Sequence, residues 1–152
     1  MKYLLDANVF IESCKNYYSF DIVPKFWETI TAEHKNDKLF SLQSVREEIL
    51  KQDDELSEWT KPLPKSFFLS ETSDVMKKYA EIQQHIRQSN QYTEQAKEEF
   101  AQSDNADPYL IAFALTNGYK LVTMEKFNSN KKNKVLIPNI CETFKVECIN
   151  NI

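Results

Sequence analysis

The sequence has 152 residues, 41% of them hydrophobic and 28% charged, and its 19 basic and 23 acidic residues give a net charge of −4. This length suits one globular domain spanning residues 1–152, and the mildly acidic balance is not that of a strongly basic nucleic-acid-binding domain. We expect a cytoplasmic protein without a membrane partner, since the chain has no long apolar run and no cleavable signal at its start.

The predicted elements begin with a short buried strand over residues 2–5 that ends at Asp6. A short helix follows at once, and a longer helix is expected around residues 20–36. The apolar side chains of the longer helix fall on one face: Ile22, Phe26, Trp27 and Ile30. Residues 39–42 are predicted as the second strand.

A helix is predicted to open at Ser44, because Glu47 stands three residues later in a capping-box pattern. The middle of the chain, about residues 53–100, is predicted as a helical insertion. Within it we expect two helical segments between about 70 and 100, with a turn near Ser89.

In the last third of the chain, helices and strands are again predicted to alternate. A helix from Pro108 to about Asn117 is predicted to end at Gly118, the residue type that favours a left-handed helix cap. Strands are then expected over residues 119–123, 135–138 and 144–149. This alternation predicts an α/β fold with a mostly parallel sheet. Gly118 is the only glycine, which excludes the glycine-rich phosphate loops of P-loop and Rossmann sites.

Four carboxylates stand near the ends of predicted strands, where ligands bind in open parallel sheets: Asp6, Glu48, Asp107 and Glu125. Each also has a structural interpretation. Asp6 could cap the following helix, and Asp107 before a proline is a typical N-cap. Glu48 and Glu125 could be solvated surface acids, and Asp104 could belong to a turn or take the place of Asp107 in the site.

The combination of these acids favours a metal site. Carboxylates that converge on one sheet edge repel one another unless a cation compensates, and carboxylate oxygens suit Mg2+ or Mn2+. The three cysteines form no close pair and are expected to be reduced, buried thiols, and the two histidines, His34 and His85, are expected on the surface. Such a site fits phosphodiester hydrolysis.

A basic loop over residues 126–134 is the main positive feature of the chain. It contains no acid and four lysines: Lys126, Lys131, Lys132 and Lys134. These side chains could bind a nucleic-acid backbone, or the loop could simply be solvated.

Four segments resemble the motifs of PIN-domain ribonucleases. LLDANVFI at 4–11 resembles the opening strand and first catalytic acid, and VREEIL at 45–50 resembles the second acidic motif, with Glu48 rather than Glu47 as the matching acid. ADPYLIAFAL at 106–115 and GYKLVTMEKF at 118–127 resemble the third and fourth motifs. Glu125 stands where the family commonly has Asp.

The resemblance implies a three-layer α/β/α sandwich and an Mg2+- or Mn2+-dependent endoribonuclease acting on single-stranded RNA. It places Asp6, Glu48, Asp107 and Glu125 in the site, supported from the second shell by three further residues: Asn8, Thr123 and Asp104. It also implies the toxin of a toxin-antitoxin pair, with an antitoxin protein as partner, and a homodimer. The alternatives are a catalytically weak PIN-like scaffold that binds RNA or a protein, and a phosphatase with Asp6 as nucleophile.

Overall fold

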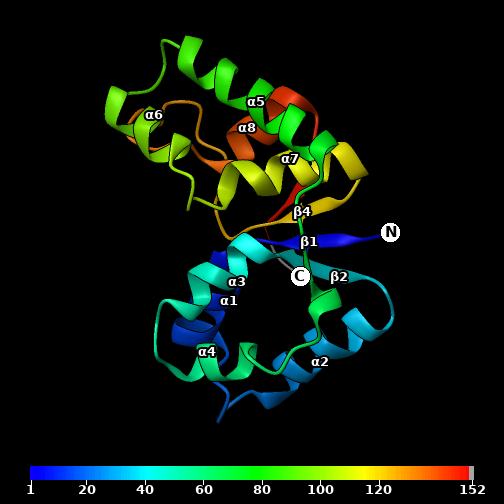
Figure 1. The fold of residues 1–152 in the computed structure, drawn as a ribbon. Coiled ribbons are helices and arrows are strands. Elements are labelled where there is room, and N and C mark those ends of the chain that lie inside the picture. The colour runs from blue at the N-terminus through cyan, green and yellow to red at the C-terminus, as the bar shows by residue number, and fades with distance from the viewer. Residues whose placement is uncertain (151–152) are drawn as a thin grey trace.

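A computed structural model of the chain, which describes residues 1–150, is built around a central sheet of five parallel strands (Figure 1). Their order across the sheet is β3-β2-β1-β4-β5. In chain order the strands are β1 (Tyr3–Leu5), β2 (Leu39–Leu42), β3 (Phe68–Leu69), β4 (Lys120–Val122) and β5 (Cys148–Ile149). The sequence-based prediction of an α/β fold with a parallel sheet is therefore confirmed.

Helices cover both faces of the sheet, so the architecture has three layers (Figure 1). One layer contains α1 (Ala7–Glu12), a π-helix (Ser13–Tyr17), α2 (Pro24–Lys35), α3 (Gln43–Leu50) and α4 (Glu55–Thr60). The other contains α5 (Ser73–Gln88), α6 (Glu94–Ala101), α7 (Asp107–Asn117) and α8 (Ile137–Phe144). A short 3-10 helix, Lys65–Phe67, leads into β3.

The strand order places a switch point beside β1. From β1 the chain adds β2 and then β3 on one side, and it later adds β4 and β5 on the other side. Connections that leave the carboxyl ends of β1 and β4 therefore turn toward opposite layers. In open parallel sheets this divergence opens a crevice, and ligands bind there.

The inner strands are buried on both faces, as expected for strands between two helical layers. All four residues of β2 are buried, as are Leu4 and Leu5 of β1. The buried apolar side chains of the whole molecule form one continuous cluster. Asp6 and Thr123 follow β1 and β4 directly, and both are buried polar residues.

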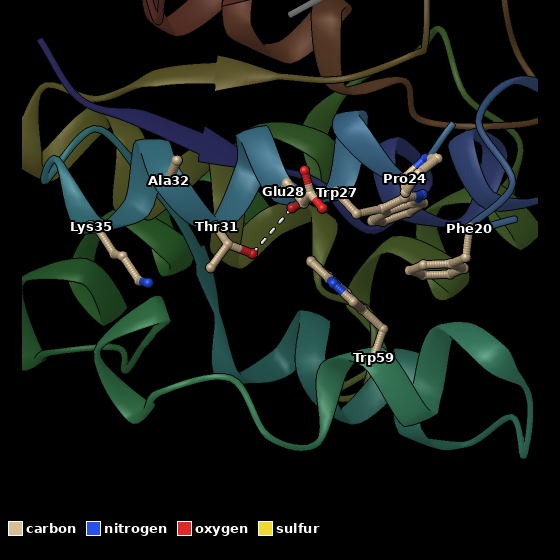
Figure 2. A pocket seen from close by; sticks show the side chains of 8 residues that line it. All are labelled: Phe20, Pro24, Trp27, Glu28, Thr31, Ala32, Lys35 and Trp59. Atoms are coloured by element: carbon tan, nitrogen blue, oxygen red, sulfur yellow. Dashed lines mark hydrogen bonds between the residues drawn. The ribbon is translucent and has the colours of Figure 1, made fainter. Parts of the chain in front are cut away.

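An aromatic cluster joins α2 to α4 on the outer side of the first layer (Figure 2). The rings of Phe20 and Trp27 stack with centroids 4.3 Å apart, and Trp59 meets Trp27 edge to face at 4.8 Å. The Trp27 indole N–H donates to the carbonyl oxygen of Tyr18 at 2.7 Å. These side chains line an open hollow of about 450 Å³, called here the aromatic hollow.

Several predicted elements differ from the observed ones. Residues 135–138 do not form a strand, because Leu136 is the N-cap of α8 and Pro138 lies in its first turn. Ser44 does not cap α3, which begins at Gln43 after Leu42 as N-cap. Ile22 lies before α2 and is 82% exposed, so it is not part of the apolar face of that helix.

Residues 53–100 are largely helical, as predicted, but they are integral to the fold. This segment supplies the edge strand β3, which pairs with β2. It also supplies α5, which packs along α7 in the second layer (Figure 1). The predicted turn near Ser89 is confirmed, since α5 ends at Gln88 and α6 begins at Glu94.

The three cysteine thiols are free; Cys141 is buried, whereas Cys14 and Cys148 are only partly covered. Within residues 1–150, no helix combines the length and the apolar character that crossing a membrane would require.

Candidate functional site at the carboxyl edge of the sheet

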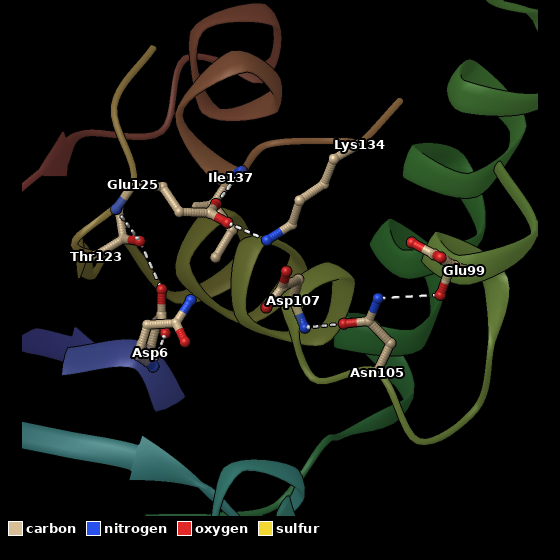
Figure 3. A network of polar contacts seen from close by, with 9 residues as sticks. Asp6, Glu99, Asn105, Asp107, Thr123, Glu125, Lys134 and Ile137 are labelled. Atoms are coloured by element: carbon tan, nitrogen blue, oxygen red, sulfur yellow. Dashed lines mark hydrogen bonds and ion pairs between the residues drawn. The ribbon is translucent and has the colours of Figure 1, made fainter. Parts of the chain in front are cut away.

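Asp6 is fixed at the switch point by its position directly after β1. Its backbone N–H donates to the carbonyl oxygen of Val122 at 3.0 Å, which extends the pairing of β1 with β4. One carboxylate oxygen accepts the Asn8 N–H, and the other accepts the Thr123 hydroxyl (Figure 3). Asp6 is thus the N-cap of α1, which was the structural alternative for this residue. It also lines a polar cavity.

The environment of Asp6 disfavours the ionised form of its carboxyl group. Burial raises the pKa of this carboxyl from its ordinary value to about 6, and the charges of Glu125 and Glu48 add to the rise. The bonds from Thr123 and Asn8 oppose the rise because they stabilise the ionised form. Asp6 therefore carries a buried charge that hydrogen bonds stabilise, and it forms no ion pair within residues 1–150.

Asp107 is the first residue of α7, and its side chain does not cap that helix. The N-cap is Ala106, and no hydrogen bond within residues 1–150 involves the Asp107 carboxylate. Its backbone N–H is held by the side chain of Asn105 at 3.0 Å. The N-cap interpretation of Asp107 is therefore wrong, and the carboxylate points to the cavity with both oxygens available (Figure 3).

Asp107 has the larger pKa shift of the two aspartates. Burial and the nearby charges of Asp6 and Glu125 raise its pKa to about 8, although the ammonium of Lys134 opposes the rise. Close to neutral pH this carboxyl is therefore largely protonated in the absence of a further cation. A shift of this kind is typical of a group that is poised for a ligand.

Glu48 reaches the same cavity from α3. It is half-buried and lines the cavity, whereas its neighbour Glu47 is exposed and does not. Burial raises the pKa of Glu48 above its ordinary value, and Lys51 partly offsets this. Of the two neighbouring glutamates, Glu48 is thus the one that lines the cavity.

Asp6, Glu48 and Asp107 share one open cavity of about 480 Å³, called here the carboxylate cavity. Asp104 also lines it, but from the exposed rim, where it forms an ion pair with Lys51 at 3.2 Å. Two aspartates could supply the third acid. Asp104 is exposed and ion-paired, whereas Asp107 is half-buried and forms no ion pair within residues 1–150.

Sequence reasoning missed two charged residues on the cavity wall, Lys51 and Glu99. Glu99 lies on α6, and its backbone carbonyl oxygen accepts a hydrogen bond from the Asn105 side-chain N–H at 3.0 Å (Figure 3). The run of acids over residues 94–107 could have indicated that Glu99 lies near the site. Lys51 stands about one helical turn after Glu48, so helical spacing could have placed it on the same side of the helix.

Glu125 is not among the residues that line the carboxylate cavity. One of its carboxylate oxygens accepts the Ile137 N–H at 2.9 Å, and the other pairs with the Lys134 ammonium at 2.8 Å (Figure 3). Its own N–H donates to the Thr123 hydroxyl oxygen at 3.1 Å, so Thr123 connects Asp6 to the Glu125 backbone.

The four lysines of the 126–134 loop take different positions. Lys134 lines the carboxylate cavity; burial would lower the pKa of its ammonium, but Glu125, Asp107 and Asp6 together raise it. Lys126 and Lys131 line an adjoining hollow, whereas Lys132 is exposed and lines neither.

The donor set of the cavity fits a hard divalent cation. Its acids offer only oxygen ligands, and burial together with repulsion from neighbouring acids raises the pKa values of Asp6 and Asp107, so a bound cation would stabilise their ionised forms. In the observed conformation no group of three or more His, Cys, Asp or Glu side chains within residues 1–150 is arranged as a metal site. The acids share a cavity without forming a finished coordination shell.

The histidines lie apart from this cavity. His34 is buried, contrary to the prediction of a surface residue, and its ring nitrogens contact the Leu39 carbonyl oxygen at 2.8 Å and the Ser66 hydroxyl at 3.0 Å. His85 is exposed, as predicted, and packs edge-on against Phe144.

Two comparisons with known proteins, against curated proteins and against solved structures, found no match for this chain. A family model described as "Domain of unknown function (DUF4411)" matches residues 3–152, which includes every strand and helix described above. The chain therefore belongs to the DUF4411 family.

Proposed function

We propose that this protein is a PIN-like, metal-dependent endoribonuclease that cleaves single-stranded RNA. One observation carries the proposal. Asp6, Glu48 and Asp107 come from segments far apart in the sequence and line one cavity at the switch point of a parallel sheet. A cap or a surface charge explains one such acid at a time, but not their meeting in a partly buried cavity that raises the pKa of all three.

In this proposal Asp6, Glu48 and Asp107 hold Mg2+ or Mn2+. When bound, such an ion activates a water molecule and stabilises charge on the scissile phosphate and the leaving oxygen. Thr123 and Asn8 keep the Asp6 carboxylate in one orientation through their hydrogen bonds. Asp107 contributes a carboxylate that accepts no hydrogen bond from any residue within 1–150.

Glu125 has a supporting role in the proposal. Its carboxylate holds the Lys134 ammonium at the edge of the carboxylate cavity, where a positive charge can meet a substrate phosphate. The side chain also ties the first turn of α8 to the loop that follows β4. The toxin role, the antitoxin partner and the homodimer stay predictions from the resemblance.

The test is cleavage of single-stranded RNA by the purified protein with Mg2+ or Mn2+. Asp6→Asn, Asp107→Asn and Glu48→Gln should each lower the cleavage rate at least about 100-fold, because each removes a charged ligand. Asn at position 6 keeps a helix-capping oxygen, so the fold should survive. Glu47→Gln is the matched control, since Glu47 is the exposed neighbour of Glu48.

The competing functions give different results. Undiminished cleavage in EDTA, or in Asp6→Asn, would overturn the metal-carboxylate mechanism. RNA binding without cleavage in either metal would support the non-catalytic scaffold. A covalent aspartyl-phosphate at Asp6 would support the phosphatase.

A further inference from the structure

A second hollow, of about 440 Å³, adjoins the carboxylate cavity. The two share Asn8 and Lys134 as lining residues, so one continues into the other along the carboxyl edge of the sheet. The walls of the second hollow include Tyr17, Lys126 and Lys131. We call it the lysine groove.

The loop that forms one wall of the lysine groove is held in place by its neighbours. The Gln91 side chain donates to the carbonyl oxygens of Ser129 at 3.2 Å and Lys131 at 2.9 Å. The Asn139 side chain binds both the N–H and the carbonyl oxygen of Asn128, at 3.0 and 2.8 Å. The backbone that carries Lys131 is therefore fixed by side-chain bonds, unlike that of a freely solvated loop.

Two of the three lysines that line the groove form no ion pair among the described residues, whereas the third, Lys134, is paired with Glu125. Neither Lys126 nor Lys131 belongs to an ion pair within residues 1–150. Of the two acids that line the groove, Glu125 is paired with Lys134 at 2.8 Å. The other, Glu12, accepts a hydrogen bond from the Asn16 side chain at 2.6 Å. Two ammonium groups are thus available to phosphates that pass along the groove.

Tyr17 supplies a different kind of contact at the same groove. It ends the π-helix after α1, and 61% of it is exposed. Its only ring neighbour in the described part of the chain is Tyr18, in a tilted contact at 6.3 Å. An exposed aromatic ring beside free lysines is the combination on which single-stranded nucleic acids bind, by base stacking and phosphate contacts.

We propose that the lysine groove binds one arm of a single-stranded RNA whose scissile phosphate lies at the carboxylate cavity, with phosphates at Lys126 and Lys131 and an unpaired base stacked on Tyr17. The inference rests on the proposed ribonuclease function, because that function defines what lies at the other end of the groove. It adds a source of specificity: a paired base in a duplex has no free face to offer Tyr17.

The experiment measures binding apart from cleavage. Fluorescence anisotropy of a short labelled single-stranded RNA is recorded in EDTA with the full-length protein. Tyr17→Ala should weaken binding about 5- to 160-fold, the range expected for one lost base–aromatic stack, and Tyr17→Phe should retain most of the affinity. The Lys126→Ala/Lys131→Ala double variant should reduce the slope of log affinity against log salt by about 1.4, or about 0.7 for each phosphate contact.

Two matched controls come from the same loop. Lys132 is exposed but lies outside the groove, and Phe127 is 52% exposed but lines a different hollow. Lys132→Ala and Phe127→Ala should therefore bind as the unaltered protein does. Equal losses in Tyr17→Ala and Phe127→Ala, or no binding by the unaltered protein, would overturn the groove. Binding through the groove without cleavage in Mg2+ or Mn2+ would overturn the ribonuclease and leave the groove in place.

Discussion

The aromatic hollow and the carboxylate cavity are similar in size, about 450 and 480 Å³, but differ in whether their side chains have partners. In the aromatic hollow, Trp27 stacks on Phe20 at 4.3 Å and its indole N–H has an acceptor at 2.7 Å. In the carboxylate cavity, the Asp107 carboxylate has no hydrogen bond within residues 1–150, and its pKa is raised to about 8.

This difference indicates what each region contributes. Side chains that satisfy one another stabilise the fold, whereas buried acids without a compensating charge reduce stability until a ligand arrives. Volume therefore does not identify the functional site here. Uncompensated charge identifies it instead. Truncating a side chain of the aromatic hollow should lower the free energy of unfolding, whereas neutralising an acid of the carboxylate cavity should raise it.

The largest expected effect on stability is at the aromatic hollow. Trp27 is 2% exposed, and Trp27→Ala should lower the free energy of unfolding by about 3–5 kcal/mol, as for other buried aromatic truncations. Urea denaturation measures this loss. Stabilisation by added Mg2+ should stay unchanged in the variant. A loss of that response along with the loss of stability would mean that the two hollows are energetically coupled.

Asp107→Asn should act in the opposite direction. The pKa of Asp107 is raised from 3.8 to about 8, so the folded state is penalised as pH rises through this window and carries the whole penalty above about pH 8. In EDTA above that pH, the variant should be more stable by about 1–3 kcal/mol, and near about pH 4 the two proteins should be equal.

The control for this prediction is Asp104→Asn, because Asp104 lines the same cavity but is exposed and paired with Lys51. It should gain no stability at high pH. Thermal unfolding with and without Mg2+ completes the comparison, since the ion should stabilise the unaltered protein and have less effect on Asp107→Asn. Equal stability of Asp107→Asn and the unaltered protein at every pH would contradict the uncompensated-charge interpretation.

The sequence predicted best where local signals and burial agree. The strand at residues 39–42 is uniformly apolar apart from Ser41 and appears with the predicted bounds. Gly118 adopts the predicted left-handed conformation, with φ of 72°, after α7. Asp6 directly follows β1, as predicted, because the apolar run that forms this strand ends at Leu5.

The failures occur where tertiary contacts decide between structures. Residues 135–138 are apolar and suit a buried strand or a buried helix start equally, and Glu125 fixes the outcome through its bond to the Ile137 N–H. The two-residue strand β3 has no periodicity to detect and is defined only by pairing with β2. The partners of Glu125 and the position of Glu99 likewise depend on long-range packing, which spacing in the sequence does not encode.

Ser44→Ala has the smallest expected effect. It tests whether an unpartnered polar group without charge, outside both hollows, matters for stability or function. The Ser44 hydroxyl is a buried polar group without a hydrogen-bond partner in the described part of the chain, yet Ser44 lines neither hollow. Its removal should leave the free energy of unfolding unchanged or raise it by up to about 1 kcal/mol, because no bond is lost. The capping box predicted from Ser44 and Glu47 requires instead a loss of about 0.5–2 kcal/mol.

Urea denaturation of Ser44→Ala separates these two outcomes. A measurable loss would restore the capping box and show that α3, which carries Glu48, is anchored by its own first turn. No loss, together with unchanged RNA cleavage, would mean that α3 is held by packing alone, through buried Val45 and Ile49. An unpartnered hydroxyl by itself would then not indicate a functional site in this protein. The indicator would be a set of charged groups that line the same cavity.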